Sequence, residues 1–107
     1  MIDLSRGFSL CVCQWGHSRS VCLTRVLHEK GYQAVACGVS GCPEAIRELS
    51  RAASHIFLLQ PHFLDAIPYE ERDKVIIVDV GPDRWVNPYN QELHQILKKL
   101  VFEKCGV

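Results

Sequence analysis

Short apolar runs alternate along this chain with stretches in which apolar residues recur every three or four positions. Such runs are typical of strands buried on both faces, whereas the wider spacing indicates amphipathic helices. The runs predict strands over residues 8–13, 33–37, 55–59 and 74–80. The spaced patterns predict helices from Ser18 or Ser20 to Gly31, and over 44–53, 61–66 and 88–104.

Strands and helices are therefore expected to alternate through the whole chain. This alternation favours a parallel sheet with right-handed crossovers. We predict an α/β fold, a three-layer sandwich with a four-stranded parallel sheet and helices on both faces. Ligands of such sheets bind beyond the carboxyl ends of the strands, near the point where the strand order reverses. The loops 13–19 and 81–85 should open together at that edge.

The chain has 107 residues, of which 48% are hydrophobic and 22% charged. This length is near the commonest size of one domain, and the composition is that of a globular protein. No linker, internal repeat or low-complexity segment divides the sequence. We expect a single domain over residues 1–107.

Basic and acidic residues balance at 12 each, so no overall field draws the chain to nucleic acid or to an acidic membrane. No apolar run approaches the roughly 18 residues of a membrane span, and the run 8–13 is too short for a signal peptide. Most of the six cysteines are interpreted as reduced core residues. We expect a cytoplasmic protein without nucleic-acid or membrane partners.

The segment between the first predicted strand and the first predicted helix suggests a chemistry. It reads Cys13-Gln14-Trp15-Gly16-His17-Ser18-Arg19-Ser20. A Cys and an Arg at this spacing alone would mean little, but the Gly and the final Ser make a chance match rare. Backbone N–H groups and a helix N-terminus can surround an anion here. We predict that residues 14–19 form a phosphate-binding loop.

The side chains of this loop suit nucleophilic attack on phosphorus. Gly16 can adopt a positive φ, and Arg19 offers a planar fork to two phosphate oxygens. The field that holds a phosphate also favours the thiolate of Cys13. The Ser20 hydroxyl could form a hydrogen bond with the sulfur and ease its departure in a second step.

A cysteinyl-phosphate mechanism also needs an acid for the leaving oxygen and a base for the water. Asp83 is the first candidate. Asp79 is the second, although it ends a predicted strand and could instead cap the following loop. Trp15 and Trp85 could wall a substrate cleft and stack against an aryl group, or could equally be packing residues.

A zinc site is not expected, because the cysteines lack the pair spacing that such sites use. The four candidates are Cys11, Cys13, Cys37 and Cys42. We predict neither a metal nor a cofactor.

With these residues the chain resembles the low-molecular-weight protein tyrosine phosphatases, and in particular the short predicted tyrosine phosphatases of bacteria. The resemblance covers essentially the whole chain. Besides the loop, residues 36–39 stand where the family often has Ser-Ala-Gly-Thr, and a late Asp loop precedes the terminal helix. It implies phosphotyrosine hydrolysis with Cys13 as nucleophile, Arg19 as phosphate clamp, Ser20 as sulfur partner and Asp83 as general acid.

Two of the departures from the family pattern concern the acid and the loop cysteines. The family usually has Asp-Pro at the acid, whereas Arg84 follows Asp83 here and an Asn-Pro pair comes later, at Asn87-Pro88. The second cysteine that is common in the loop is Ser18 in this chain.

Three other functions could use the same loop. An arsenate reductase would relay oxidation through Cys37 or Cys42, and a phosphocarrier would keep phosphate on Cys13. A non-catalytic phosphate or phosphotyrosine reader would bind without turnover. For the phosphatase, the expected partner is a phosphorylated protein or small phosphomonoester, with inorganic phosphate as product.

Overall fold

The computed structural model describes residues 2–41, 43–82 and 84–107. In chain order, its elements are β1 (Ser9–Cys13), α1 (Arg19–Glu29), β2 (Ala34–Gly38), α2 (Pro43–Ala52), β3 (His55–Leu58), the 3-10 helices η1 (Pro61–Ala66) and η2 (Tyr69–Lys74), β4 (Val75–Ile77) and α3 (Gln91–Cys105).

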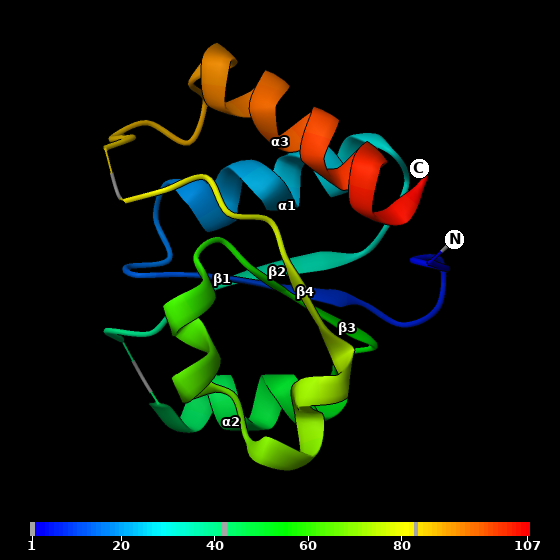
Figure 1. The fold of residues 1–107 in the computed structure, drawn as a ribbon, viewed down its shortest axis with the longest axis vertical. Coiled ribbons are helices and arrows are strands. Elements are labelled where there is room, and N and C mark those ends of the chain that lie inside the picture. Colours follow the sequence, from blue (N-terminus) through cyan, green and yellow to red (C-terminus); the bar gives the residue numbers. More distant parts are fainter. Residues whose placement is uncertain (1, 42, 83) are drawn as a thin grey trace.

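The strands form one parallel sheet in the order β2-β1-β3-β4. Helices α1 and α3 cover one face, and α2 lies on the other face together with η1 and η2 (Figure 1). The predicted three-layer fold is confirmed. The strand order reverses at β1, because β2 lies on one side of it and β3 on the other. The crevice that this reversal creates lies beyond the carboxyl ends of β1 and β3.

Strand β1 forms the centre of the hydrophobic core. All of its residues are buried, as expected for a strand with neighbours on both sides and helices on both faces. The register places Cys13 opposite Gly38 of β2. The last residue of β1 is therefore held at the sheet edge where a ligand can approach.

The strand predicted over 74–80 is shorter in the structure. Strand β4 contains only Val75–Ile77, and Lys74 belongs to the 3-10 helix η2. The sequence of η2 is polar and lacks the apolar spacing by which helices were predicted, so η2 was not expected. The chain beyond β4 still follows β3. The N–H groups of Val78 and Val80 donate to carbonyls of the segment that ends β3, at 2.9 and 3.1 Å.

The closing helix begins at Gln91 and not at residue 88 as predicted. Asn90 occupies the N-cap, and its Oδ1 accepts a hydrogen bond from the N–H of Leu93 at 3.0 Å. Asparagine is among the preferred N-cap residues, so this local bond sets the start of the helix. Gly106, with φ 74°, terminates it.

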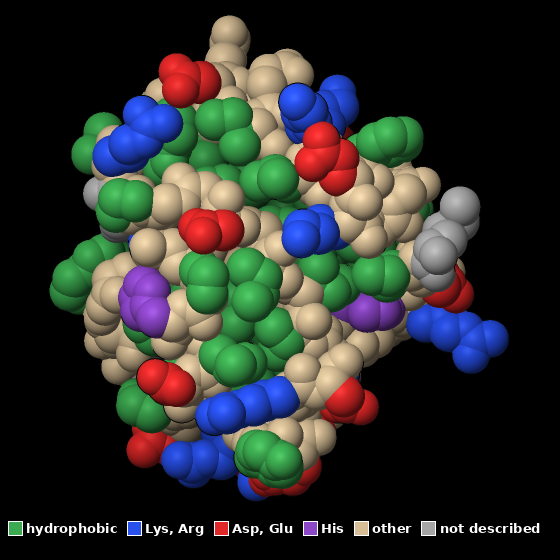
Figure 2. All heavy atoms as spheres, in the orientation of Figure 1, with side chains coloured by type: hydrophobic (Ala, Val, Ile, Leu, Met, Phe, Trp, Pro, Cys, Tyr) green, Lys and Arg blue, Asp and Glu red, His purple; other side chains and the backbone are tan. Residues whose placement is uncertain are grey.

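In the described part of the chain, none of the helices has the length and apolar character needed to cross a membrane. On the face drawn in Figure 2, basic and acidic side chains are interspersed. This surface agrees with the equal numbers of basic and acidic residues in the sequence.

Candidate active site

The predicted phosphate loop connects β1 to α1 at the carboxyl edge of the sheet. The segment after β2 fastens the start of this loop. Val39 donates its N–H to the carbonyl of Cys13, and Ser40 donates its N–H to the carbonyl of Gln14, both at 2.9 Å. The Gln14 amide also donates to the Ser40 hydroxyl. The backbone of the loop is therefore held by its neighbouring strand.

Two glycines allow the loop to pack directly on the end of β2. Gly16 has φ 75°, and a Cβ there would lie 2.8 Å from the backbone nitrogen of Gly38. A Cβ on Gly38 would lie 2.3 Å from the carbonyl carbon of Trp15. Neither position can accept a side chain without movement of the backbone. The positive φ expected at Gly16 is present, whereas the residue pattern did not predict the close approach at Gly38.

The Cys13 side chain is 2% exposed and has two polar neighbours at its sulfur. The N–H of Gly16 donates to Sγ at 3.2 Å, and the Ser20 Oγ lies 3.1 Å from Sγ. The thiol donates to this hydroxyl, and a thiolate would accept from it instead. Donors directed at the sulfur stabilise negative charge on it. The structure thus brings Cys13, Gly16 and Ser20 together.

Cys11 and Cys22 lie in a different environment. Burial raises the pKa of the Cys11 thiol to about 12, although a hydrogen bond with Thr24 opposes the shift. Burial likewise raises the pKa of the Cys22 thiol to about 11. Both groups therefore remain neutral thiols at ordinary pH. They behave as small apolar residues of the core.

Arg19 is the first residue of α1, and its side chain is 1% exposed. Its Nη1 donates to Oε1 of Gln60 at 2.6 Å and to the carbonyl of Gly81 at 2.8 Å. Its Cζ lies 5.6 Å from the centroid of the Phe63 ring, a favourable arrangement for a cation. These contacts come from the segments that follow β3 and β4. Arg19 therefore connects the phosphate loop to both segments.

The loop after β4 was predicted to supply the general acid and a cleft wall. Asp83 lies outside the described residues. Asp79 is exposed, and its Oδ1 accepts the N–H of Gly81 at 2.9 Å, which caps the loop locally. Trp85 is 5% exposed and belongs to the hydrophobic core, and the Arg84 guanidinium lies 3.9 Å from its ring centroid. This burial agrees with the packing alternative, and a cleft-wall role for Trp85 remains a prediction.

The remaining loop residues differ in exposure. Trp15 is 58% exposed, and His17 is also exposed. Ser18 is buried at the N-cap of α1, but its side chain makes no capping hydrogen bond. Trp15 as a wall of the substrate site remains a prediction.

Sequence reasoning missed three groups that contact Arg19: the Gln60 amide, the Phe63 ring and the Gly81 carbonyl. One signal could have found Gln60. It follows the third predicted strand, so the rule for parallel sheets places it at the same edge as Cys13. Its residue type matches no catalytic motif, and a backbone carbonyl such as that of Gly81 has no sequence signal.

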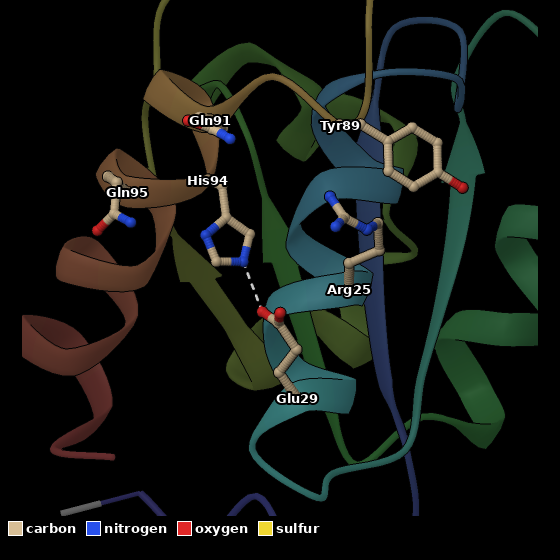
Figure 3. Close-up of a pocket in the computed structure, with 6 residues that line it drawn as sticks. All are labelled: Arg25, Glu29, Tyr89, Gln91, His94 and Gln95. Carbon is tan, nitrogen blue, oxygen red and sulfur yellow. Dashed lines mark hydrogen bonds and ion pairs between the residues drawn. The ribbon is translucent and has the colours of Figure 1, made fainter.

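A cavity of about 450 Å³ lies between α1 and α3, apart from the phosphate loop (Figure 3). Its lining residues are Arg25, Glu29, Tyr89, Gln91, His94 and Gln95. His94 forms a hydrogen bond with Glu29 and thereby lowers the pKa of that carboxyl. Arg25 donates to the carbonyl of Pro88 at 3.0 Å. These contacts join the two helices and the turn before α3.

Among residues 2–41, 43–82 and 84–107, no three His, Cys, Asp or Glu side chains are grouped so that they could hold a metal ion.

The fold and the loop define a parallel α/β protein with a cysteine at the carboxyl edge of its central strand. No protein-family model matches the sequence, and no curated protein matches it either. Solved structures do match the fold. The Erwinia amylovora tyrosine phosphatase AmsI has a TM-score of 0.72 at 12% identity, over 94% of this chain and 91% of that chain.

Two further structures give the same result. Vibrio vulnificus Wzb in complex with benzylphosphonate has a TM-score of 0.68 at 16% identity, over 91% of this chain and 95% of that chain. The tyrosine phosphatase Wzb from Escherichia coli K30 in complex with phosphate also has a TM-score of 0.68 at 16% identity, over 91% and 94%. The chain therefore has the fold of the bacterial low-molecular-weight tyrosine phosphatases, which confirms the fold that the resemblance implied.

Proposed function

We propose that this protein is a cysteine-dependent phosphatase that hydrolyses phosphomonoesters, protein phosphotyrosine above all. The observation that carries the proposal is the environment of Cys13. Its sulfur lies at the carboxyl end of the central strand, 3.2 Å from the Gly16 nitrogen and 3.1 Å from the Ser20 hydroxyl. The structural neighbours add support, since they include tyrosine phosphatases with phosphate or benzylphosphonate bound.

In the first step, the Cys13 thiolate attacks phosphorus. The S–P bond forms as the bond from phosphorus to the leaving oxygen breaks, and Asp83 protonates that oxygen. Arg19 and the backbone N–H groups of the loop stabilise the phosphoryl oxygens. The alcohol or phenol then leaves, and phosphate remains on the sulfur.

In the second step, water attacks the cysteinyl phosphate. Asp83, now a carboxylate, accepts a proton from the water, the S–P bond breaks and inorganic phosphate leaves. The Ser20 hydroxyl donates to the departing thiolate. Neither step requires a cofactor.

Trp15 supports an aryl phosphate as substrate. The indole is 58% exposed within the phosphate loop. An exposed aromatic ring beside the reacting phosphate can stack on the ring of phosphotyrosine, which a phosphoserine cannot offer.

We also propose that residues 1–107 form a single domain that works in the cytoplasm. Cys11, Cys13, Cys22 and Cys105 are free thiols, which supports a reducing compartment. The proposed partners are phosphorylated proteins or small phosphomonoesters, without nucleic acid or membranes.

The test is hydrolysis of an aryl phosphate by the wild type, Cys13→Ser and Cys11→Ala. Serine at position 13 should lower turnover by at least about a thousandfold, because the nucleophile is lost. Cys11→Ala removes a buried sulfur two positions earlier on the same strand, so it should keep turnover within about threefold wherever it remains folded. Full activity of Cys13→Ser would refute the mechanism, and a wild type that binds phosphate without turnover would indicate a reader or carrier.

A further inference from the structure

A second recess lies beside the cavity of Figure 3, where the end of α1 meets α3. It has a volume of about 330 Å³. Gln95 lines both hollows, so they adjoin along α3. Together they form what we call the α1–α3 groove, which extends from Tyr89 to Phe102. The residues that line the second recess are Lys30, Gln95, Lys98, Lys99 and Phe102.

The spacing of residues along α3 places the lining side chains on one side of the helix. His94, Lys98 and Phe102 recur at every fourth position, and residues four apart are neighbours on a helix surface. At a rise of about 1.5 Å per residue, the part of α3 from Gln91 to Phe102 is about 16 Å long. The groove is therefore long enough for an extended peptide of about five residues.

The α1–α3 groove carries an excess of positive charge, although the whole chain is neutral. Among residues 2–41, 43–82 and 84–107, no acidic side chain forms an ion pair with Lys30, Lys98 or Lys99. Glu29, which lines the cavity, has His94 as its partner. This hydrogen bond and, to a smaller extent, the charge of Lys98 lower the pKa of Glu29. The three lysines can therefore meet the carboxylates of a partner.

Exposed aromatic rings lie at both ends of the groove. Tyr89 is 65% exposed and Phe102 is 63% exposed. The guanidinium of Arg25 covers one side of the Tyr89 ring, with Cζ 4.3 Å from the centroid. Within the described ranges, neither a cation nor another ring stacks on Phe102. An apolar side chain of a partner would remove the Phe102 ring from water and thereby favour binding.

The polar groups of the groove favour a peptide over a nucleic acid or a membrane. Gln91 and Gln95 are exposed, and each amide can both donate to and accept from a peptide main chain. The carboxylate of Glu29 can accept a main-chain N–H, but it would repel the phosphates of a nucleic acid. A flat lipid surface cannot follow a concave lining. An acidic peptide satisfies the lysines, the amides and Glu29 together.

We propose that the α1–α3 groove binds a short acidic segment of another protein. Its carboxylates pair with Lys30, Lys98 and Lys99, and one of its apolar side chains covers Phe102. None of the residues that line the groove belongs to the phosphate loop. This binding therefore does not depend on the proposed hydrolysis.

The experiment measures peptide binding by fluorescence anisotropy. The labelled peptide is a short fluorescein-tagged chain of alternating glutamate and phenylalanine, and the same peptide with glutamine in place of glutamate is the neutral comparison. The protein variants are Lys98→Glu and Phe102→Ser. Lys104→Glu is the matched control, because Lys104 is an exposed residue of the last turn of α3 that does not line the groove.

The wild type should bind the glutamate peptide at least about tenfold more tightly than the glutamine peptide, and added salt should reduce this difference. Lys98→Glu should raise the Kd of the glutamate peptide about tenfold, since it replaces an attraction by a repulsion. Phe102→Ser should raise it about threefold, because apolar contact is lost. Lys104→Glu should stay within about twofold. All three variants should hydrolyse an aryl phosphate as the wild type does.

Equal affinity of the wild type for the two peptides would overturn the inference, and so would the absence of measurable binding. Equal effects of Lys98→Glu and Lys104→Glu would overturn it too, because the charge of the whole protein would then explain the binding. Thermal midpoints of the variants show that each is folded, and the exposure of both Lys98 and Phe102 favours this.

Other occupants of the groove give different results. If oligouridylate or phosphatidylserine vesicles bind more tightly than the peptide and lose affinity in Lys98→Glu alone, the groove takes that anion and the inference fails. Sedimentation of a wild-type dimer that Lys98→Glu dissociates would assign the groove to a second copy of this chain, which also contradicts the inference.

Failure of the proposed function can be told apart from failure of this inference. Cys13→Ser should bind the glutamate peptide as the wild type does. A wild type that binds the peptide through Lys98 but does not hydrolyse aryl phosphates would refute the function alone. Turnover that depends on Cys13, without preference for the acidic peptide, would refute the inference alone.

Discussion

Helix α1 carries two arginines that make the same kind of contact with one loop. Nη1 of Arg19 donates to the carbonyl of Gly81 at 2.8 Å, and Nη1 of Arg25 donates to the carbonyl of Pro88 at 3.0 Å. The two hydrogen bonds hold opposite ends of the segment 81–88, which carries Asp83.

Each guanidinium also lies over an aromatic ring. Arg19 is 5.6 Å from the Phe63 centroid, and Arg25 is 4.3 Å from the Tyr89 centroid. Cation–π contacts of this kind contribute about 0.5–2 kcal/mol, depending on desolvation. Contact chemistry alone therefore does not separate the two residues.

Burial and position on the helix separate them. Arg19 is the first residue of α1 and is 1% exposed, whereas Arg25 lies more than a turn further on and is half-buried beside the cavity in Figure 3. A cation buried at the positive end of a helix is unfavourable in itself. The proposed phosphate would offset this cost at Arg19, whereas the contacts of Arg25 are explained by the packing of the fold.

Replacing each arginine with lysine should separate the two roles most clearly. Arg19→Lys should lower kcat/KM for an aryl phosphate by about 10²–10³, because lysine cannot contact two phosphate oxygens and the β3 and β4 segments together. Arg25→Lys should stay within about threefold. Steady-state kinetics with circular dichroism measures both, and equal losses in the two folded variants would contradict the comparison.

The next largest effect should come from the loop that the two arginines hold. Asp83→Asn should lower turnover by about 10²-fold and remove one ionisation from the pH profile, as loss of a general acid and base does. Asp79→Asn should change turnover little, because the Asp79 side chain caps its own loop through the Gly81 N–H.

Asn87→Asp provides the opposite test. If the general acid acts from the Asn-Pro position, this variant should gain activity and Asp83→Asn should have no effect. If Asn87→Asp raises turnover and Asp83→Asn leaves turnover unchanged, Asp83 is not the general acid.

The smallest effect is expected at the cavity beside Arg25. The hydrogen bond from His94 lowers the pKa of Glu29 in the folded protein. Because the pKa of Glu29 is lower in the folded than in the unfolded protein, its carboxylate stabilises the fold fully at pH values above the unfolded pKa. This contribution is lost as the pH falls through the folded pKa.

Glu29→Gln should therefore lower the thermal midpoint slightly near pH 6, and the difference from the wild type should vanish by about pH 3. Glu103→Gln, at an exposed position of α3, is the control and should show no such pH dependence. Activity should be unchanged in both variants. A loss of turnover in Glu29→Gln would show that the cavity is coupled to the phosphate loop.

Local sequence determined most of the elements and the chemistry of the loop. Residue type and spacing account for three features, since each depends on neighbours along the chain. These are the burial of β1, the alternation of strands and helices, and the positive φ of Gly16. The same local reasoning placed Cys13 at the end of β1, ahead of the helix that begins with Arg19.

The tertiary structure decided which groups surround Arg19 and which aromatic residue lies in the core. Gln60 and the Gly81 carbonyl are separated from Arg19 by 41 and 62 positions in the chain. The parallel-sheet rule places Gln60 at the edge of Cys13, but neither contact follows from a pattern of neighbouring residues. By sequence, Trp85 could have been a cleft wall or a packing residue, and its burial among core residues became visible only in the tertiary structure. Residue type thus determined the chemistry of each group, whereas strand order and packing determined which groups meet.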